Sequence, residues 1–238
     1  MKQRIILALA VIITGLISCS KDSDSSIPVT ASYINFFSAV PGVSYDVEID
    51  TSSIGTDIGY GEATGYHSFE AKRYTLFIYP AGDHTTLIGG GQVSLRNDHY
   101  YSVYLSKNHN GVLQLLLVED KLQKATAGYG RIKVVDLSDS YYSSGTQQLL
   151  MDYYIDSTRR FQNINYLAAT PFVEIPAGPR EQNIRWAGSS IKIVSDSNFL
   201  YNNTAQLTIE DQKSYSIIAY GNAFVADSFK LTTFTHEK

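Results

Sequence analysis

The sequence is poor in several features that define large classes of proteins. Cysteine occurs once in 238 residues, which excludes a disulfide framework and a cysteine-based zinc site. Charged residues make up only 18% against 44% hydrophobic residues, which excludes a disordered polyelectrolyte. No run of Lys or Arg occurs and the formal net charge is −4, which argues against nucleic acid as a partner.

What the chain has in quantity is apolar residues and tyrosine, with 18 Tyr against one Trp and two Met. Its length is enough for one large domain or for two domains of about 100 residues, each able to bury a core.

The N-terminus has the layout of a secretory signal peptide. Lys2 and Arg4 precede an apolar run from Ile5 to Ile17. This run is shorter than the roughly 20 residues that a membrane-spanning helix needs. Residues 1–18 are therefore predicted to be removed, which changes the net charge from −4 to −6 because both basic residues lie in this segment.

The only cysteine follows this run directly. The sequence Leu16-Ile17-Ser18-Cys19 resembles the lipobox of bacterial lipoproteins, in which the peptidase cuts before a cysteine that becomes diacylated. The resemblance implies lipidation of Cys19 and attachment to a membrane through acyl chains, since two or more chains anchor a protein stably. A free thiol in an ordinary transmembrane anchor is the alternative.

Residues 19–30 are predicted to form the lipidated end and a flexible tether, because residues 20–26 are small, polar and acidic. The Lys21-Asp22 pair resembles the signal by which some Gram-negative phyla export lipoproteins to the outer face of the outer membrane. Ser20 after the cysteine also fits the outer membrane. We therefore expect an outer-membrane lipoprotein, with exposure on the cell surface or an ordinary periplasmic linker as the two alternatives.

The rest of the chain lacks helical periodicity and predicts an all-β fold. Short apolar or alternating runs, rich in β-branched and aromatic residues, recur between Gly, Asn, Asp and Ser. Examples are residues 33–37, 45–49, 74–79, 100–105, 112–118, 131–135, 151–155, 191–194, 205–209, 215–220 and 228–234. Many strands at regular spacing suggest β-sandwiches.

An internal repeat divides the chain into two parts. Residues 46–82 and 152–188 are identical at 11 of 37 positions without a gap. The offset between the copies grows by 8 residues twice, which places two loop insertions in the second copy near residues 141–148 and 196–201. We predict one sandwich over residues 31–123 and a diverged second copy over residues 130–238, with the boundary between Lys124 and Gly130.

The first copy carries the residues of a known family. The stretch Ile34–Asp50, the segment Tyr60–Gly82 and the later Val93–Val103 resemble the domain-of-unknown-function 4397 family over most of residues 31–122. The resemblance implies an immunoglobulin-like sandwich on a secreted or surface protein, and it implies no established activity.

Asp46, Glu48 and Asp50 are weak candidates for a metal site. Strand alternation places them on one face, opposite Tyr45, Val47 and Ile49, in steps of about 6.5–7 Å. One Ca²⁺ cannot reach all three carboxylates without neighbouring loops. We predict a solvated sheet face instead, with Asp50 and its counterpart Asp156 starting the following turns. In the second copy, alternation likewise places Asp152 outward.

No sequence motif indicates catalysis or a cofactor. The five His form no metal-binding pattern and are predicted to be exposed or partly buried. The glycines at 59, 61 and 65 do not fit a dinucleotide fingerprint and predict a turn, and Gly89-Gly90-Gly91 predicts a loop or hairpin. We therefore expect no cofactor, no metal and no enzymatic activity. An enzyme would need a concave pocket with perturbed titratable groups.

Aromatic residues are the remaining binding candidates. Tyr141 and Tyr142 lie in an insertion of the second copy, and Trp186 stands where the first copy has Pro80. Exposed Tyr and Trp make good binding anchors, although β-sandwiches also use Tyr simply because it favours strands.

The leading interpretation is a lipid-anchored, non-enzymatic binding or adhesion module of the cell envelope, with a glycan or a protein as ligand. The alternatives are a glycan-binding component of a carbohydrate-capture system and a structural subunit of an envelope assembly. Fold alone does not choose between them.

Overall fold

The computed structural model describes residues 30–141, 147–193, 205–225 and 228–237. This part of the chain contains only strands, turns and loops, and the all-β prediction of two sandwiches is confirmed. Cys19 and Tyr142 lie outside the described residues. No helix of the described part is long and apolar enough to cross a membrane.

The first sandwich consists of two four-stranded sheets, in the orders β4-β1-β7-β8 and β3-β2-β5-β6. Its strands are β1 (Ser32–Ser38), β2 (Tyr45–Ile49), β3 (Ser52–Ile58), β4 (His67–Phe69), β5 (Arg73–Pro80), β6 (Gly89–Ser94), β7 (Tyr100–Lys107) and β8 (Leu113–Asp120). All pairs are antiparallel except β1 with β7, which run parallel.

The second sandwich repeats this topology, with β9 and β17 as its parallel pair. One sheet has the order β12-β9-β17-β18 with β13 also on β9, and the other has β11-β10-β14-β15 with β16 also on β14. Its strands are β9 (Tyr129–Leu137), β10 (Met151–Ile155), β11 (Thr158–Ile164), β12 (Ala168–Ala169), β13 (Val173–Pro176), β14 (Gly178–Trp186), β15 (Lys192–Ile193), β16 (Ala205–Ile209), β17 (Ser214–Tyr220) and β18 (Lys230–His236).

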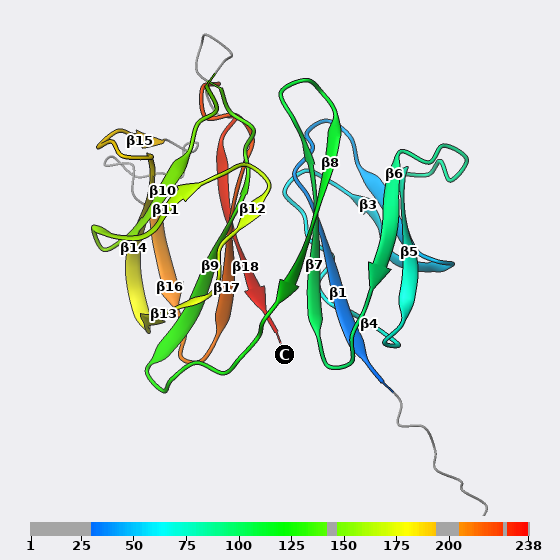
Figure 1. Ribbon diagram of the computed structural model, residues 1–238, viewed down its shortest axis with the longest axis horizontal. Coiled ribbons are helices and arrows are strands. Elements are labelled where there is room, and N and C mark those ends of the chain that lie inside the picture. Colours follow the sequence, from blue (N-terminus) through cyan, green and yellow to red (C-terminus); the bar gives the residue numbers. More distant parts are fainter. Residues whose placement is uncertain (1–29, 142–146, 194–204, 226–227, 238) are drawn as a thin grey trace, which may run out of the picture.

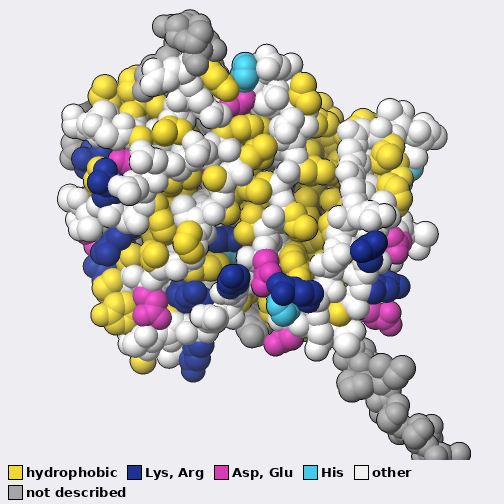
Figure 2. Space-filling view, in the orientation of Figure 1, with side chains coloured by type: hydrophobic (Ala, Val, Ile, Leu, Met, Phe, Trp, Pro, Cys, Tyr) yellow, Lys and Arg dark blue, Asp and Glu magenta, His cyan; other side chains and the backbone are white. Residues whose placement is uncertain are grey.

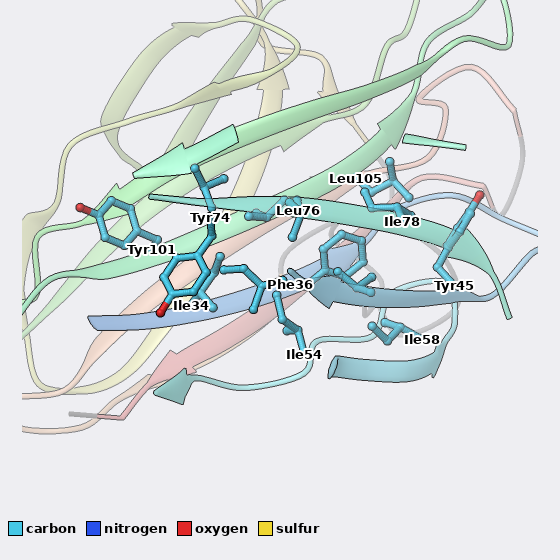
Figure 3. Close-up of a cluster of buried hydrophobic side chains, with 14 of the residues drawn as sticks. Ile34, Phe36, Tyr45, Ile54, Ile58, Tyr74, Leu76, Ile78, Tyr101 and Leu105 are labelled. Carbon is cyan, nitrogen blue, oxygen red and sulfur yellow. The ribbon is translucent and has the colours of Figure 1, made fainter. Parts of the chain in front are cut away.

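Each sandwich has its own apolar core, built by strand alternation. In the first, Ile34 and Phe36 of β1 face Leu76 and Ile78 of β5 within one cluster of buried side chains, drawn in Figure 3. A second cluster fills the second sandwich, with Tyr153 of β10 at 0% exposure.

A third apolar cluster joins the two sandwiches. It contains Phe37 and Tyr104 of the first sandwich and Val135, Ile218 and Tyr220 of the second, all at most 8% exposed. The sheet holding β1 and β7 therefore lies against the sheet holding β9 and β17, as Figure 1 shows. Every residue of β7 from Tyr100 to Ser106 is buried, because this strand is covered on both faces.

A buried polar network crosses the same interface. Lys133 of β9 forms an ion pair with Asp120 of β8, and both side chains are at most 2% exposed. The second oxygen of Asp120 accepts hydrogen bonds from the hydroxyls of Ser102 at 2.6 Å and Tyr66 at 2.7 Å. His236 continues the network from its Nδ1 to Tyr66 at 2.6 Å and from its Nε2 to Ser216 at 2.7 Å.

The structure corrects several expectations. His236 is 4% exposed, whereas the sequence predicted exposed or partly buried histidines. For Gly89-Gly90-Gly91 the sequence predicted a loop or a hairpin, and the structure has the second, since these residues form the first half of β6, paired antiparallel with β5. Their backbone pairs regularly because a glycine in a strand loses only side-chain packing, not hydrogen bonds.

Candidate functional site

A cleft between the sandwiches is the best candidate for a ligand site. It has a volume of 170 Å³ and is lined by Ala39, Pro41, Lys107, Asn108, His109, Leu137, Asp139, Gly221, Asn222 and Ser228. These residues come from the loops that follow β1 and β9 and from the β7–β8 and β17–β18 connections. Both connections lie at the end of the molecule shown at the top of Figure 1.

The β7–β8 turn is held in place by its own side chains. The Asn108 Oδ1 accepts hydrogen bonds from the backbone N–H of Asn110 at 3.1 Å and Val112 at 2.9 Å. Gly111 completes the turn at φ 82°, a left-handed conformation that favours glycine. The turn thereby carries His109 toward the second sandwich.

Asp139 ties the two sandwiches together at this cleft. One of its oxygens accepts a hydrogen bond from the His109 backbone N–H and contacts the His109 Nδ1, both at 2.8 Å. Its other oxygen accepts a bond from the Gln148 side-chain amide at 2.8 Å. Asp139 is only 8% exposed, so its carboxylate builds the cleft rather than being open to a ligand.

Hydrogen bonds also hold the β17–β18 connection in place. The Ser140 hydroxyl accepts a hydrogen bond from the Ala223 N–H at 2.9 Å, and the Asn222 Oδ1 accepts one from the Phe224 N–H at 2.9 Å. Hydrogen bonds thus hold the loops around the cleft in place, and the polar side chains of Asn222 and Lys107 belong to its lining.

The predicted aromatic residues take different places. Tyr141 contacts His109 of the cleft lining, with the two ring centroids 4.1 Å apart. Trp186, at the end of β14, lies against Phe224 with ring centroids 5.4 Å apart. Phe224 is 40% exposed and lies two residues beyond Asn222 of the cleft in the sequence, but neither Phe224 nor Trp186 belongs to the lining of the cleft.

The carboxylates of β2 do not form the solvated face that alternation predicts. Asp46 is 5% exposed, and it accepts backbone hydrogen bonds from Asp57 of β3 at 2.8 Å and from Gly82 of the β5–β6 connection at 2.9 Å. His84 lies between Asp46 and Glu48, at 2.9 Å from one carboxylate and 3.1 Å from the other. Burial by itself raises the pKa of Asp46, but these hydrogen bonds outweigh it and hold that pKa below its usual value.

The second sandwich contradicts the same expectation at the equivalent position. Asp152 is 0% exposed and accepts hydrogen bonds from the backbone of Asn163 at 2.9 Å and Gly188 at 3.2 Å. Asp46 and Asp152 thus each hold a neighbouring strand and one loop, which is a structural role shared by the copies.

Asp50 and Asp156 lie in the turns that follow β2 and β10, as the sequence predicted, at φ 51° and 48°. Among the described residues, no group of three or more His, Cys, Asp or Glu side chains is arranged to hold a metal.

Sequence reasoning missed His109, Asn222 and Phe224. The Asn108–Gly111 composition signals a turn, but nothing in it indicates that Asp139, thirty residues away, receives His109. The β17–β18 loop gives no motif at all.

The molecule is thus a pair of fused β-sandwiches with a loop-lined cleft at their junction. Residues 32–142, which contain the first sandwich and β9, match the profile of the family described as Domain of unknown function (DUF4397). The resemblance found in the sequence is confirmed.

Among solved structures, the chain is similar to one described as a "putative cell adhesion protein" from Bacteroides eggerthii. The two share 9% sequence identity, the match covers 89% of this chain and 97% of the other, and the TM-score is 0.21. No curated protein matches the chain.

Proposed function

We propose that the protein is a non-enzymatic binding or adhesion module of the cell surface, held to the outer membrane by a lipid on Cys19. One observation carries the proposal. The described chain begins beside Ser32 at one end of β1, whereas the cleft lies beyond Ser38 at the other end. The N-terminal end of β1, to which a tether would be joined, therefore lies at the end of the molecule opposite the cleft, shown at the bottom of Figure 1.

Seven residues of extended strand put about 23 Å between the two ends of β1. The cleft would thus face away from the membrane, toward ligands outside the cell. Loops at one end of a sandwich are a common place for binding residues, because the sheets below hold them rigidly.

The anchor is tested by Cys19→Ala. We expect the wild-type protein in the membrane fraction and the variant in the soluble fraction, because the variant has no site for acyl chains. Cys19→Ser serves as a second variant with the same prediction. Continued attachment of both variants to membranes would overturn the lipid anchor.

A glycan is the ligand class that the cleft favours, since Asn108 and Asn222 belong to its lining and Tyr141 contacts His109 of the same lining. The labelled full chain is applied to a glycan array. Binding to at least one glycan should be lost in Tyr141→Ala and kept in Tyr129→Ala, an exposed tyrosine at the start of β9.

Absence of binding to every glycan would remove the carbohydrate-capture candidate and leave a protein ligand or a structural role. Pull-down from membranes separates these two, because an assembly subunit should copurify with fixed envelope partners.

A further inference from the structure

The first sandwich is open along one side. β6 ends the sheet β3-β2-β5-β6 and β8 ends the sheet β4-β1-β7-β8, so within the described residues the outer edges of both strands are unpaired. Figure 2 shows hydrophobic side chains gathered on this face of the molecule between the two strands. We call this region the β6–β8 groove.

β8 directs apolar side chains into the groove. Leu115 lies opposite Leu105 and Leu117 opposite Val103, and these two partners belong to the buried core. Paired residues share a face of the sheet, so both leucines point to the inner side of the sandwich. They are nevertheless 37% and 44% exposed, because the opposite sheet ends at β6 and does not cover them.

On the other side of the groove, β6 has a glycine and therefore no side chain to fill the space. Gly91 lies opposite the core residue Leu76 and therefore faces inward. A Cβ atom at Gly91 would meet no heavy atom within 4 Å. A hollow of 180 Å³ follows, lined by Leu76, Gly90, Gly91, Gln92, Val93, Val103, Leu115 and Leu117.

The second sandwich keeps a leucine at one of the two equivalent places, since Leu231 pairs with Ala219 as Leu115 pairs with Leu105, and differs at the other. Leu117 pairs with Val103 in the first sandwich, and Thr233 pairs with Ile217 in the second. The hydroxyl of an exposed threonine forms hydrogen bonds with water, whereas an exposed leucine gains free energy only when its apolar surface is buried. The exposed apolar side chain at the position of Leu117 is thus a feature of the first sandwich and not of the shared fold.

We propose that the β6–β8 groove accepts an extended strand from a partner protein, with apolar side chains at alternate positions. The backbone of the strand would pair with the free edge of β6, and one of its apolar side chains would fill the hollow beside Gly91. β6 has none of the devices that normally block an edge, since residues 89–94 include no charged residue and no proline.

A second copy of this chain fits the groove less well. Pairing of β6 with β6 would bring inward-facing Gly89 and Gly91 from both copies and leave the hollow unfilled. The strand must therefore carry side chains that β6 itself lacks, which points to a different polypeptide.

The probes are four fluorescein-labelled peptides, seven residues of Thr alternating with Val, Ile, Leu or Phe between terminal lysines. Fluorescence anisotropy with the purified full chain should show saturable binding of at least one of them. Gly91→Lys should weaken it at least tenfold, because the side chain enters the hollow without a clash in the free protein. Leu117→Thr, which copies the second sandwich, should weaken it as well.

Val43→Thr is the matched control, since Val43 is a 48% exposed apolar residue of the same sandwich outside the groove. It should bind the peptide like the wild type. A peptide with proline at the central position should not bind, because proline removes a strand hydrogen bond.

Absence of saturable binding, or equal binding by Gly91→Lys, would overturn the proposal. Sedimentation of the full chain should show a monomer. A dimer abolished by Gly91→Lys would place a second copy in the groove and would overturn the partner strand. Glycan binding at the interdomain cleft should be unchanged in Gly91→Lys, so the two proposals fail independently.

Discussion

The two sandwiches share the hydrogen bonds by which buried carboxylates stabilise the fold, and they differ in exposed side chains that could contact a partner. Asp46 and Asp152 each hold a neighbouring strand and one loop by backbone hydrogen bonds. By contrast, Leu117 and Thr233 occupy matching positions on β8 and β18 with opposite polarity. The comparison separates structural carboxylates, which both copies keep, from surfaces that only one copy has.

The copies also contribute different halves of one buried network. The first sandwich supplies the carboxylate of Asp120, and the second supplies the ammonium of Lys133 and the imidazole of His236. The sandwiches are thus complementary at their interface rather than interchangeable.

The largest effect is expected when this complementarity is broken on one side. Lys133→Met leaves the Asp120 carboxylate buried without its cation, which typically reduces the free energy of unfolding by about 3–5 kcal/mol. Urea denaturation measures the change. The double variant Lys133→Met, Asp120→Leu is the control and should recover much of the loss, and an unchanged single variant would contradict the role of the pair.

A pH dependence follows from His236. Burial lowers the pKa of His236 to about 4, against 6.5 for a free histidine. Between these values the unfolded state binds a proton that the folded state does not, so stability is complete above pH 6.5 and is lost as the pH falls toward 4. The loss is about 3 kcal/mol at most.

Chemical denaturation between pH 7 and 4 tests this dependence. The variant His236→Gln cannot titrate there and should give a flatter profile than the wild type. Profiles of equal slope would show that other groups cause the acid sensitivity.

The shared loop anchors predict matching losses in the two copies. Asp46→Ala and Asp152→Ala should each lower the free energy of unfolding by about 1–3 kcal/mol, because each leaves buried backbone N–H groups without an acceptor. Asp50→Ala, at a residue exposed in its turn, is the milder comparison. Losses that differ severalfold between Asp46 and Asp152 would contradict a common role.

The smallest effect is a gain in stability. Asp136 is fully buried, its Oδ2 has no hydrogen-bond partner among the described residues, and burial raises the pKa of its carboxyl well above the usual value. The folded state therefore becomes less favourable as the pH rises past the ordinary carboxyl range. Asp136→Ser places there the residue found at Ser38 of the first copy and should stabilise the protein by about 1 kcal/mol at pH 7.

Thermal unfolding at pH 7 and at pH 4 measures this gain, which should shrink at the lower pH. A destabilised Asp136→Ser at both pH values would show that the carboxyl is needed for packing.

Local patterns were enough to predict part of this fold. The alternation in Tyr45–Ile49 and Met151–Ile155 predicted β2 and β10 with their observed bounds, because a half-buried strand has a clear period of two. The three glycines of β6 left a loop and a hairpin open as alternatives, since they carry no side chains to show a period, and the structure has the hairpin.

The site was less predictable, because its contacts join residues far apart in the chain. Tyr141 was found as an exposed-tyrosine candidate, but its partner His109 belongs to the other sandwich. Alternation predicted correctly that Asp46 points away from the core, but wrongly that it is exposed. The residues that cover it, Asp57 of β3 and Gly82 of the β5–β6 connection, leave no signal in the sequence of β2.

The central claim is that the two sandwiches form one body, since only then do their loops build the cleft. Differential scanning calorimetry of the full chain tests this most directly. We predict a single transition whose calorimetric and van't Hoff enthalpies agree. Two separate transitions, with Lys133→Met leaving one of them unmoved, would contradict it.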